Sequence, residues 1–316
     1  MSRHQTDVAV VGEIYIDHVF SGFPAWPGPG EEVVTDHYVR EIGGGAAATA
    51  CGLARLGRRV DLIGLIGAAD REWFARRLAD FGLGLDGLSV VDGKTGVTVS
   101  VSTAQDRSFF THIGVNSLLS ALLTTPAVVA RLCAARHVHF ALPLERPVAA
   151  RLLPQLSEAG CTTSLDMGWQ PFWLTDPLNL ETLTQVDHLL PNEKEAELLA
   201  GAAGSAPFFA HAAALPLRHP MLKLGARGAM SAEVGADPVQ VGPPQVTALD
   251  TTGAGDAFDA GFIDGLLDGG DARERLRRGC VTGGLSTRAA GALGALPDRA
   301  ELNLVYQQTY GDSHDS

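Results

Sequence analysis

The chain has few of the residues that stabilise small secreted or metal-clamped domains. It contains only four cysteines among 316 residues, Cys51, Cys133, Cys161 and Cys280. They are widely separated and include no CxxC pair, so the sequence indicates neither a disulfide framework nor a zinc site. No apolar run is long enough to cross a bilayer, and no secretory leader precedes the first apolar run. We therefore expect a cytoplasmic protein with reduced thiols.

Positive charge is also scarce. The 24 lysines and arginines are outnumbered by 36 aspartates and glutamates, which gives a formal net charge of −12 at pH 7. An acidic surface is repelled by phosphodiester backbones and by anionic headgroups, so we expect neither nucleic acid nor membrane as a partner. A small anionic cofactor would have to be held by local groups.

Short apolar runs alternate with helical patterns along most of the chain. This alternation is typical of an α/β domain with a mostly parallel sheet, and the length allows one large domain with a small appendage. Strands are expected at 8–11, 60–66, 137–140, 162–165, 188–190 and 221–224, and helices at 46–56, 71–81, 147–159, 193–200, 256–267 and 272–290.

Two segments interrupt this alternation. Residues 13–40 are rich in proline and glycine, and residues 94–112 alternate in polarity like a hairpin. We predict that they form a small β-sheet on a core made of residues 1–12, 41–93 and 113–311, with a tail at 312–316. The alternative is a surface meander that does not move.

The most informative motif runs from Asp250 to Asp256, with the sequence DTTGAGD. Gly253 and Gly255 allow a turn whose main-chain amides point into one concavity, and the helix predicted after it would turn its positive end towards the same place. Asp256 is then placed to accept a proton from a hydroxyl that attacks a phosphorus held by those amides. An ordinary N-cap aspartate behind a glycine turn is the alternative.

The longer segment DTTGAGDAFDAGFI resembles, position by position, the C-terminal signature of the ribokinase-like (PfkB) carbohydrate kinase family. GEIYID, GGGAAATACGLARLG, PNEKE and KLGARG follow in the family's order, so the resemblance covers almost the whole chain. It implies a three-layer α/β/α ribokinase-like fold in which the small β-sheet is a lid over the sugar and often pairs in a homodimer. It also implies transfer of the γ-phosphoryl group of ATP, with Asp256 as the general base and the amides of Gly253, Ala254 and Gly255 as an anion hole.

The resemblance assigns the acceptor side to the first third of the chain. In sugar kinases of this family an aspartate at the place of Asp17 binds sugar hydroxyls, and glycines at Gly43, Gly44 and Gly45 let the ring approach the main chain. Many members carry an asparagine where this chain has Ala48. The usual polar contact is missing there, so a preference for ribose is not carried over.

Two further positions match ligand-contacting places in the family. Asn116 corresponds to an asparagine that reaches the ligand, although capping of the helical segment after it explains the residue equally well. Asp166 begins a variable loop that differs among sugar-acid and hexose kinases. The loop aromatics Trp169, Phe172 and Trp173 are able to stack on a sugar or a nucleobase, and the alternative is that they pack within the loop.

The PNEKE segment is the predicted magnesium site. It fits the family's NxxE pattern through Asn192 and Glu195, oxygen donors that suit a Mg²⁺ ion bound mostly through water. The alternative is a capping asparagine followed by an acidic first turn. Asp250 and Thr252 are candidates for a K⁺ site, because residues 289–292 resemble the cation loop of many members.

The nucleotide side is predicted around KLGARG. The resemblance puts the turn formed by Gly225 and Gly228 against the triphosphate, with Lys223 as a nearby positive charge. Thr252, Gly253 and Gly255 complete the predicted contacts with ATP.

The acceptor is left open among pentoses, hexoses, keto-deoxy sugar acids and nucleosides. Few basic residues stand beside the acceptor motifs, which argues against an acceptor that is already phosphorylated. A sugar or nucleotide sensor without catalytic activity is the alternative of another class, because a fold alone does not establish chemistry. The joint presence of Asp256, the glycine turn and the Asn192/Glu195 pair favours the enzyme.

Overall fold

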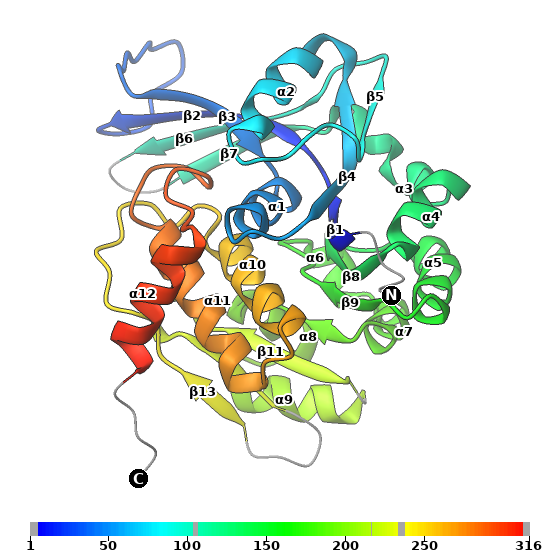
Figure 1. Cartoon of the computed structure of the whole chain (residues 1–316). Coiled ribbons are helices and arrows are strands. Elements are labelled where there is room, and N and C mark those ends of the chain that lie inside the picture. Colours follow the sequence, from blue (N-terminus) through cyan, green and yellow to red (C-terminus); the bar gives the residue numbers. More distant parts are fainter. Residues whose placement is uncertain (1–5, 104–106, 216, 233–237, 312–316) are drawn as a thin grey trace.

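The computed structural model describes residues 6–103, 107–215, 217–232 and 238–311. Its centre is a nine-stranded sheet in the order β13-β12-β11-β10-β9-β8-β1-β4-β5 (Figure 1). The strands from β11 to β5 are parallel, and β12 and β13 are antiparallel at one edge. The strands are β1 (Thr6–Gly12), β4 (Val60–Gly67), β5 (Leu88–Val91), β8 (Ala135–Ala141), β9 (Thr162–Leu165), β10 (His188–Leu189), β11 (His219–Lys223), β12 (Ala229–Ser231) and β13 (Val239–Val241).

Helices cover both faces of this sheet. Side chains alternate along a strand, so Val8 and Val10 pack into one apolar core while Ala9 and Val11 pack into the other. The first core is covered by α1 (Gly45–Arg55), α2 (Arg71–Ala79), α10 (Ala254–Leu267) and α11 (Ala272–Ser286), with α12 (Arg299–Tyr310) outside α11. The second is covered by α3 (Leu119–Leu122), α4 (Pro126–Cys133), α5 (Arg146–Glu158), α6 (Pro171–Thr175), α7 (Leu180–Gln185), α8 (Glu193–Ala200) and α9 (Ser205–Ala214). The predicted three-layer fold is confirmed.

Small residues let α1 and α10 pack closely. A Cβ atom built on Gly52 would lie 2.8 Å from the Cβ of Ala260, which is closer than real side chains approach. The Thr49 hydroxyl of α1 also donates to the main-chain oxygen of Asp256, at 3.1 Å. The alanine-rich start of α1 is therefore a helix-packing surface, and it brings the amino ends of α1 and α10 together.

The second sheet has four strands in the order β3-β2-β6-β7. These are β2 (Tyr15–Phe23), β3 (Tyr38–Gly43), β6 (Gly96–Thr103) and β7 (Arg107–His112), so a separate small sheet forms as predicted. Strand β3 crosses the boundary expected at residue 40. Residues 104–106 of the hairpin, and the predicted tail at 312–316, lie outside the described residues.

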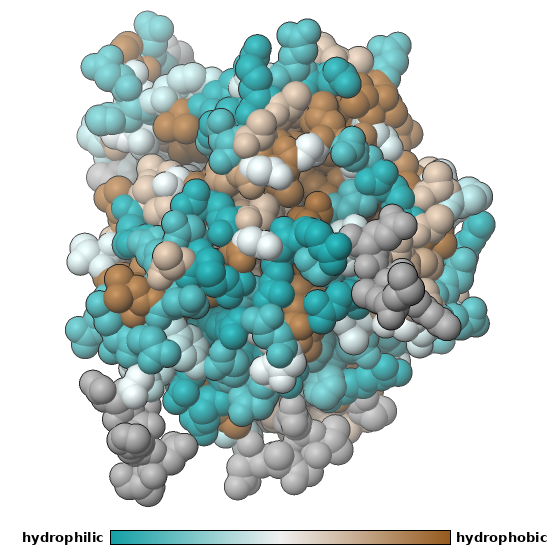
Figure 2. Space-filling model, viewed as in Figure 1, coloured by the Kyte–Doolittle hydropathy of each residue, from teal (hydrophilic) through white to brown (hydrophobic). Residues whose placement is uncertain are grey.

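Several helix ends differ from the prediction, by one to four residues. Helix α10 begins at Ala254 rather than at 256, and α11 ends at Ser286 rather than at 290. The residues after α11 turn back, and Gly291 has a φ of 77° that favours glycine. In the face shown by Figure 2, hydrophilic side chains cover most of the surface over α11 and α12. Within the described residues no single helix could span a bilayer, while one bent helix pair, Gly114–Leu122 with Pro126–Cys133, meets the length and composition criteria.

Candidate active site

The DTTGAGD loop is held in one conformation by its own side chains. Both carboxylate oxygens of Asp250 accept hydrogen bonds, one from the amide and hydroxyl of Thr252 at 2.9 and 2.7 Å, the other from the amide of Gly291 at 2.9 Å. Gly253 follows with a φ of 72°, and a Cβ atom there would lie 2.4 Å from the Cβ of Ala292. Only glycine fits this position, so the loop and residues 291–292 form one unit at the start of α10.

The predicted anion hole lies in the first turn of α10. Because the helix begins at Ala254, the amides of this turn point out of the helix end, where the helix dipole favours an anion. The amide of Ala254 itself donates to the oxygen of Thr251 at 3.2 Å. That amide would have to share or exchange this bond to bind a phosphoryl oxygen.

Asp256 lies against the glycine turn at the start of α1. A Cβ atom built on Gly45 would be only 2.6 Å from its Oδ1. Burial raises the pKa of Asp256 to about 7, with the Asp166 carboxylate adding to the rise, Lys223 opposing it and Asp17 adding a little more. A carboxylate that titrates near neutrality is suited to accept and release a proton at physiological pH.

Asp17 approaches the same turn from the small sheet. A Cβ atom on Gly43 would be 2.0 Å from its Oδ1, and Gly44 has a φ of 95°. Burial raises the pKa of Asp17 to about 6, and the Glu41 carboxylate adds to the rise. The structure thus brings two half-buried carboxylates, one from the small sheet and one from the start of α10, to one run of glycines.

A buried ion cluster lies beside Asp256. The Lys223 ammonium is 2.6 Å from Oδ2 of Asp166 and 3.1 Å from Oδ1 of Asp259, and Gly168 donates its amide to the other oxygen of Asp166 at 2.9 Å. Carboxylate oxygens of Asp166, Asp256 and Asp259 lie within 4.8 Å of one another. Lys223, which the sequence assigns to the nucleotide side, is 8% exposed and is bonded directly to a predicted acceptor residue.

Asn116 is bonded to the junction of β1 and β2. Its Oδ1 accepts from the amide of Ile14 at 3.1 Å, and its Nδ2 donates to the oxygen of Ile14 at 2.9 Å. It caps neither the 3₁₀ helix Gly114–Leu118 nor α3. The side chain therefore stabilises the start of the small sheet, and contact with a ligand stays a prediction.

Asn192 and Glu195 form a capping box at the start of α8. Asn192 accepts from the amide of Glu195 at 3.1 Å, while its own amide and its Nδ2 donate to the two carboxylate oxygens at 2.9 and 2.6 Å. Glu195 is 2% exposed, and burial raises its pKa to about 7, with Asp166 adding to the rise and Lys223 opposing it. This is the geometry of a capping asparagine followed by an acidic first turn, the alternative to a magnesium site. It leaves a water-mediated metal contact as the compatible role.

The KLGARG turn follows β11 and contains the 3₁₀ helix Gly225–Arg227. Gly225 has a φ of 57° and Gly228 of 87°, and a Cβ atom on Gly228 would lie 1.8 Å from the oxygen of Val241. The Arg227 guanidinium is ion-paired with Glu193 of α8. Both glycines are required by the turn itself, whatever they bind.

The loop after Asp166 exposes two of its three aromatic side chains. Trp173 donates its Nε1 to the oxygen of Leu144 at 3.1 Å and packs against the core, as the packing alternative expects. Trp169 is 58% exposed and Phe172 94% exposed, so packing does not account for them.

The comparisons with known proteins identify the family of this chain. The model of the pfkB family of carbohydrate kinases matches residues 5–299. This chain belongs to that family. A ribokinase of Haemophilus influenzae is 29% identical over 303 residues, or 93% of this chain and 96% of the relative. An ATP-dependent ribose-1-phosphate kinase of Halopiger xanaduensis is 33% identical over 263 residues, or 81% of this chain and 84% of the relative.

The fold is that of the pfkB kinases. The structure of Arabidopsis thaliana ribokinase complexed with ribose and ATP has a TM-score of 0.85 to this chain at 23% identity, covering 96% of this chain and 99% of that one. The resemblance to the family is thereby confirmed. The protein is an ATP-dependent carbohydrate kinase, a phosphotransferase with an alcohol group as acceptor.

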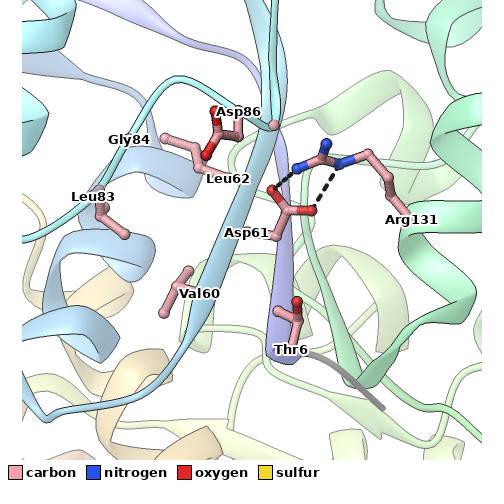
Figure 3. Close-up of a pocket in the computed structure, with 9 residues that line it drawn as sticks. Thr6, Val60, Asp61, Leu62, Leu83, Gly84, Asp86 and Arg131 are labelled. Carbon is pink, nitrogen blue, oxygen red and sulfur yellow. Dashed lines mark hydrogen bonds and ion pairs between the residues drawn. The ribbon is translucent and has the colours of Figure 1, made fainter. Parts of the chain in front are cut away.

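The two cavities described in this pfkB kinase lie away from the cluster. One, of about 200 Å³, lies between the amino ends of β1 and β4 and is lined by Asp61 and Arg131, which are paired at 2.8 Å (Figure 3). The other, of about 430 Å³, is lined by Arg58, Arg278 and Arg299. Ligands of a doubly wound sheet bind at the carboxyl ends of its strands, where Asp166 and Lys223 lie. Neither cavity is therefore proposed as the catalytic site.

The sequence reasoning missed Asp259. It lies three residues after Asp256 in the same helix, a spacing that puts two side chains on one helix face. That spacing is the signal that could have found it. Its pairing with Lys223, 36 residues away in the chain, could not have been read from the sequence.

Proposed function

We propose that the protein transfers the γ-phosphoryl group of ATP to a hydroxyl of a small uncharged sugar or sugar-like acceptor, with Asp256 as the general base. The observation that supports this most is the position of Asp256: its carboxylate is at the amino end of α10, against the glycine turn that also meets Asp17. A base at that place can reach a hydroxyl held by Asp17 while the helix end holds the phosphorus.

In the proposed reaction the acceptor oxygen attacks the γ-phosphorus in line with the leaving group. The new bond joins the acceptor oxygen to phosphorus, the bond from phosphorus to the β–γ bridging oxygen breaks, and ADP leaves. Asp256 takes the hydroxyl proton. The amides of Gly253, Ala254 and Gly255 stabilise the charge on the transferring group.

ATP is proposed to lie along Lys223, Thr252 and the Gly225–Gly228 turn. Mg²⁺ bound with ATP would neutralise charge on the β- and γ-phosphates. Asn192 and Glu195 are proposed to hold this ion through water, since Mg²⁺ keeps several waters and the Glu195 carboxylate is already engaged by Asn192. Glu195→Gln should raise the Mg²⁺ concentration needed for half-maximal rate about 10-fold, on the scale of supporting groups at metal sites. An unchanged magnesium titration would remove Glu195 from the metal site.

Three further predictions are kept as parts of the proposal. A K⁺ ion at Asp250 would have to coordinate a carboxylate that already accepts three hydrogen bonds. A homodimer through the small sheet is supported by its exposed side chains Tyr38, Val39, Phe109 and Phe110, which are 47, 43, 58 and 55% exposed. Sedimentation equilibrium tests the homodimer. Activity assays with and without K⁺ test the cation site. A cytoplasmic location remains a prediction from composition.

The acidic acceptor side supports an uncharged acceptor. Asp17 is near Glu41, and both Asp17 and Asp166 act on Asp256, so a phosphate or carboxylate on the acceptor would be repelled. Free sugars are therefore proposed ahead of sugar acids and sugar phosphates. Nucleosides are the second candidate, favoured by the exposed Trp169 and Phe172 in the loop after Asp166.

The test is ATP-consumption assays with free sugars, sugar acids, sugar phosphates and nucleosides, with ligand binding measured by calorimetry on the same panel. We expect turnover with at least one uncharged sugar or nucleoside and none with the phosphorylated compounds. Saturable binding without turnover across the panel would favour the sensor instead.

A further inference from the structure

Asp259 and Lys223 form a buried pair that the proposed reaction does not yet use. Asp259 is fully buried in α10, and Lys223 at the end of β11 is 8% exposed. The ammonium lies 3.1 and 3.3 Å from the two oxygens of Asp259 and 2.6 Å from Oδ2 of Asp166. A buried ammonium is stable only when it is paired, and here two carboxylates fix its position from two sides.

The ammonium also lies next to the predicted anion hole. A Cβ atom built on Gly255 would be 3.6 Å from the Nζ of Lys223, so the charge is close to the first turn of α10. Three carboxylates within 4.8 Å of one another could in principle bind a divalent cation. The ammonium already contacts two of them, Asp166 and Asp259, so the cluster is built around a lysine.

We propose that Asp259, together with Asp166, is a positioning residue that holds the Lys223 ammonium under the first turn of α10, where its charge assists phosphoryl transfer. This inference rests on the proposed function. An anion hole of amides offers only partial charges, and a full charge fixed nearby adds stabilisation without rearrangement during the reaction. Lys223 then acts on the transferring group, and Asp259 acts through Lys223.

A double-mutant cycle on kcat tests this. Lys223→Met should lower kcat about 100-fold, the scale of losing one stabilising donor of an anion hole. Asp259→Asn should lower kcat by roughly 10-fold, because the ammonium keeps only Asp166 as a charged partner. In the double variant, loss of Asp259 should add nothing to the loss from Lys223→Met, since Asp259 acts only through the lysine.

The stability of the same variants should follow a different pattern from kcat. Lys223→Met leaves two buried carboxylates without their partner and should lower the unfolding midpoint, and the double variant should recover part of that loss. Arg151→Met removes an exposed cation of α5, outside the proposed site, and is the control, with kcat unchanged. If Asp259→Asn does not fold, Asp259→Ser is used in the same cycle.

Two results would overturn the inference. One is an Asp259 variant with a lowered midpoint and the kcat of the wild type, which makes the pair purely structural. The other is additive losses of kcat in the double variant, which separate Asp259 from Lys223. The proposed function is tested separately by Asp256→Asn. If that variant keeps its turnover, Asp256 is not the general base, whatever the double-mutant cycle shows.

Discussion

Helix α10 carries buried carboxylates at both ends, and the two ends differ in the number of cations around them. Near its start, Asp259 is fully buried beside a single lysine. Near its other end, Asp264 is also fully buried, but it accepts hydrogen bonds from Arg58 at 2.6 Å, Arg278 at 2.7 Å and Arg299 at 2.8 Å.

The pKa values of these carboxylates move in opposite directions. Burial raises the pKa of Asp259 well above its ordinary value, and the neighbouring lysine offsets only part of that rise. Burial also acts on Asp264, but hydrogen bonds from Arg299 and the charges of Arg58 and Arg299 lower its pKa below the ordinary value. A fully compensated carboxylate stabilises the fold. An undercompensated one is available for chemistry, so the cation count separates the structural end of α10 from the reactive end.

The sharpest test of the reactive end is Asp256→Asn. We expect kcat to fall about 1,000-fold, because the asparagine amide cannot take the proton from the attacking hydroxyl. Binding of ATP and of the acceptor should be largely kept. Steady-state rates measure kcat, and calorimetry measures the binding of ATP and of the acceptor. Asp268→Asn, at the structural end and 43% exposed in its side chain, is the control and should keep the kcat of the wild type. A loss of rate in both variants would abolish the distinction between the ends.

The structural end should respond in stability instead. Asp264→Asn should lower the free energy of unfolding by about 3 kcal/mol, because three arginine side chains lose a buried partner. Urea denaturation measures this, with Asp268→Asn as the control expected to lose at most about 1 kcal/mol. The kcat of the folded Asp264 variant should equal that of the wild type. An unchanged urea midpoint would mean that the arginines do not need Asp264.

The glycine turn offers a milder way to disturb the reactive end. Gly45→Ala would put a Cβ atom 2.6 Å from Oδ1 of Asp256, and the carboxylate can turn away more easily than the main chain can move. We expect kcat to fall roughly 10-fold with little loss of stability, since a small misplacement of a catalytic group is felt strongly in the rate. Gly242→Ala adds the same methyl group where nothing lies within 4 Å, and it should be neutral in rate. Equal rates in both variants would show that Asp256 tolerates the displacement.

The sequence predicted the parts of the site that depend on local geometry. Gly44 and Gly253 have φ values of 95° and 72°, and such positions are marked directly by glycine in the motifs. The strands that lead to Asp166 and Lys223 were likewise expected, because buried parallel strands read as short apolar runs. The fold class followed from these two signals together with the resemblance.

The remaining features depend on tertiary contacts. The sequence assigned Lys223 to the nucleotide side, but its partners are Asp166, the residue after β9, and Asp259 of α10. Asn116 looked like a ligand contact or a cap, yet its bonds go to Ile14, which is 102 residues earlier. Contacts between residues so far apart in the chain depend on the order of strands in the sheet. That order cannot be derived residue by residue from a single sequence.

The pH dependence of stability should have opposite signs at the two ends of α10. The folded-state pKa of Asp256 is raised from 3.8 to about 7, so the folded protein holds this proton more tightly than the unfolded chain, and the stabilisation is lost as pH rises through that window. Asp256→Asn removes this titration, so its stability relative to the wild type should rise between pH 4 and pH 7 and level off above pH 7.

The Asp264 carboxylate should behave in the reverse way. Its folded-state pKa is lowered, so its contribution is present above 3.8 and is lost as pH falls. The deficit of Asp264→Asn should thus be largest near neutrality and shrink below pH 4. Urea denaturation of both variants and the wild type from pH 3 to pH 8 measures the two slopes. Slopes of the same sign would mean that the number of neighbouring cations does not determine which end of α10 is reactive, because both carboxylates would then be stabilised in the same ionisation state.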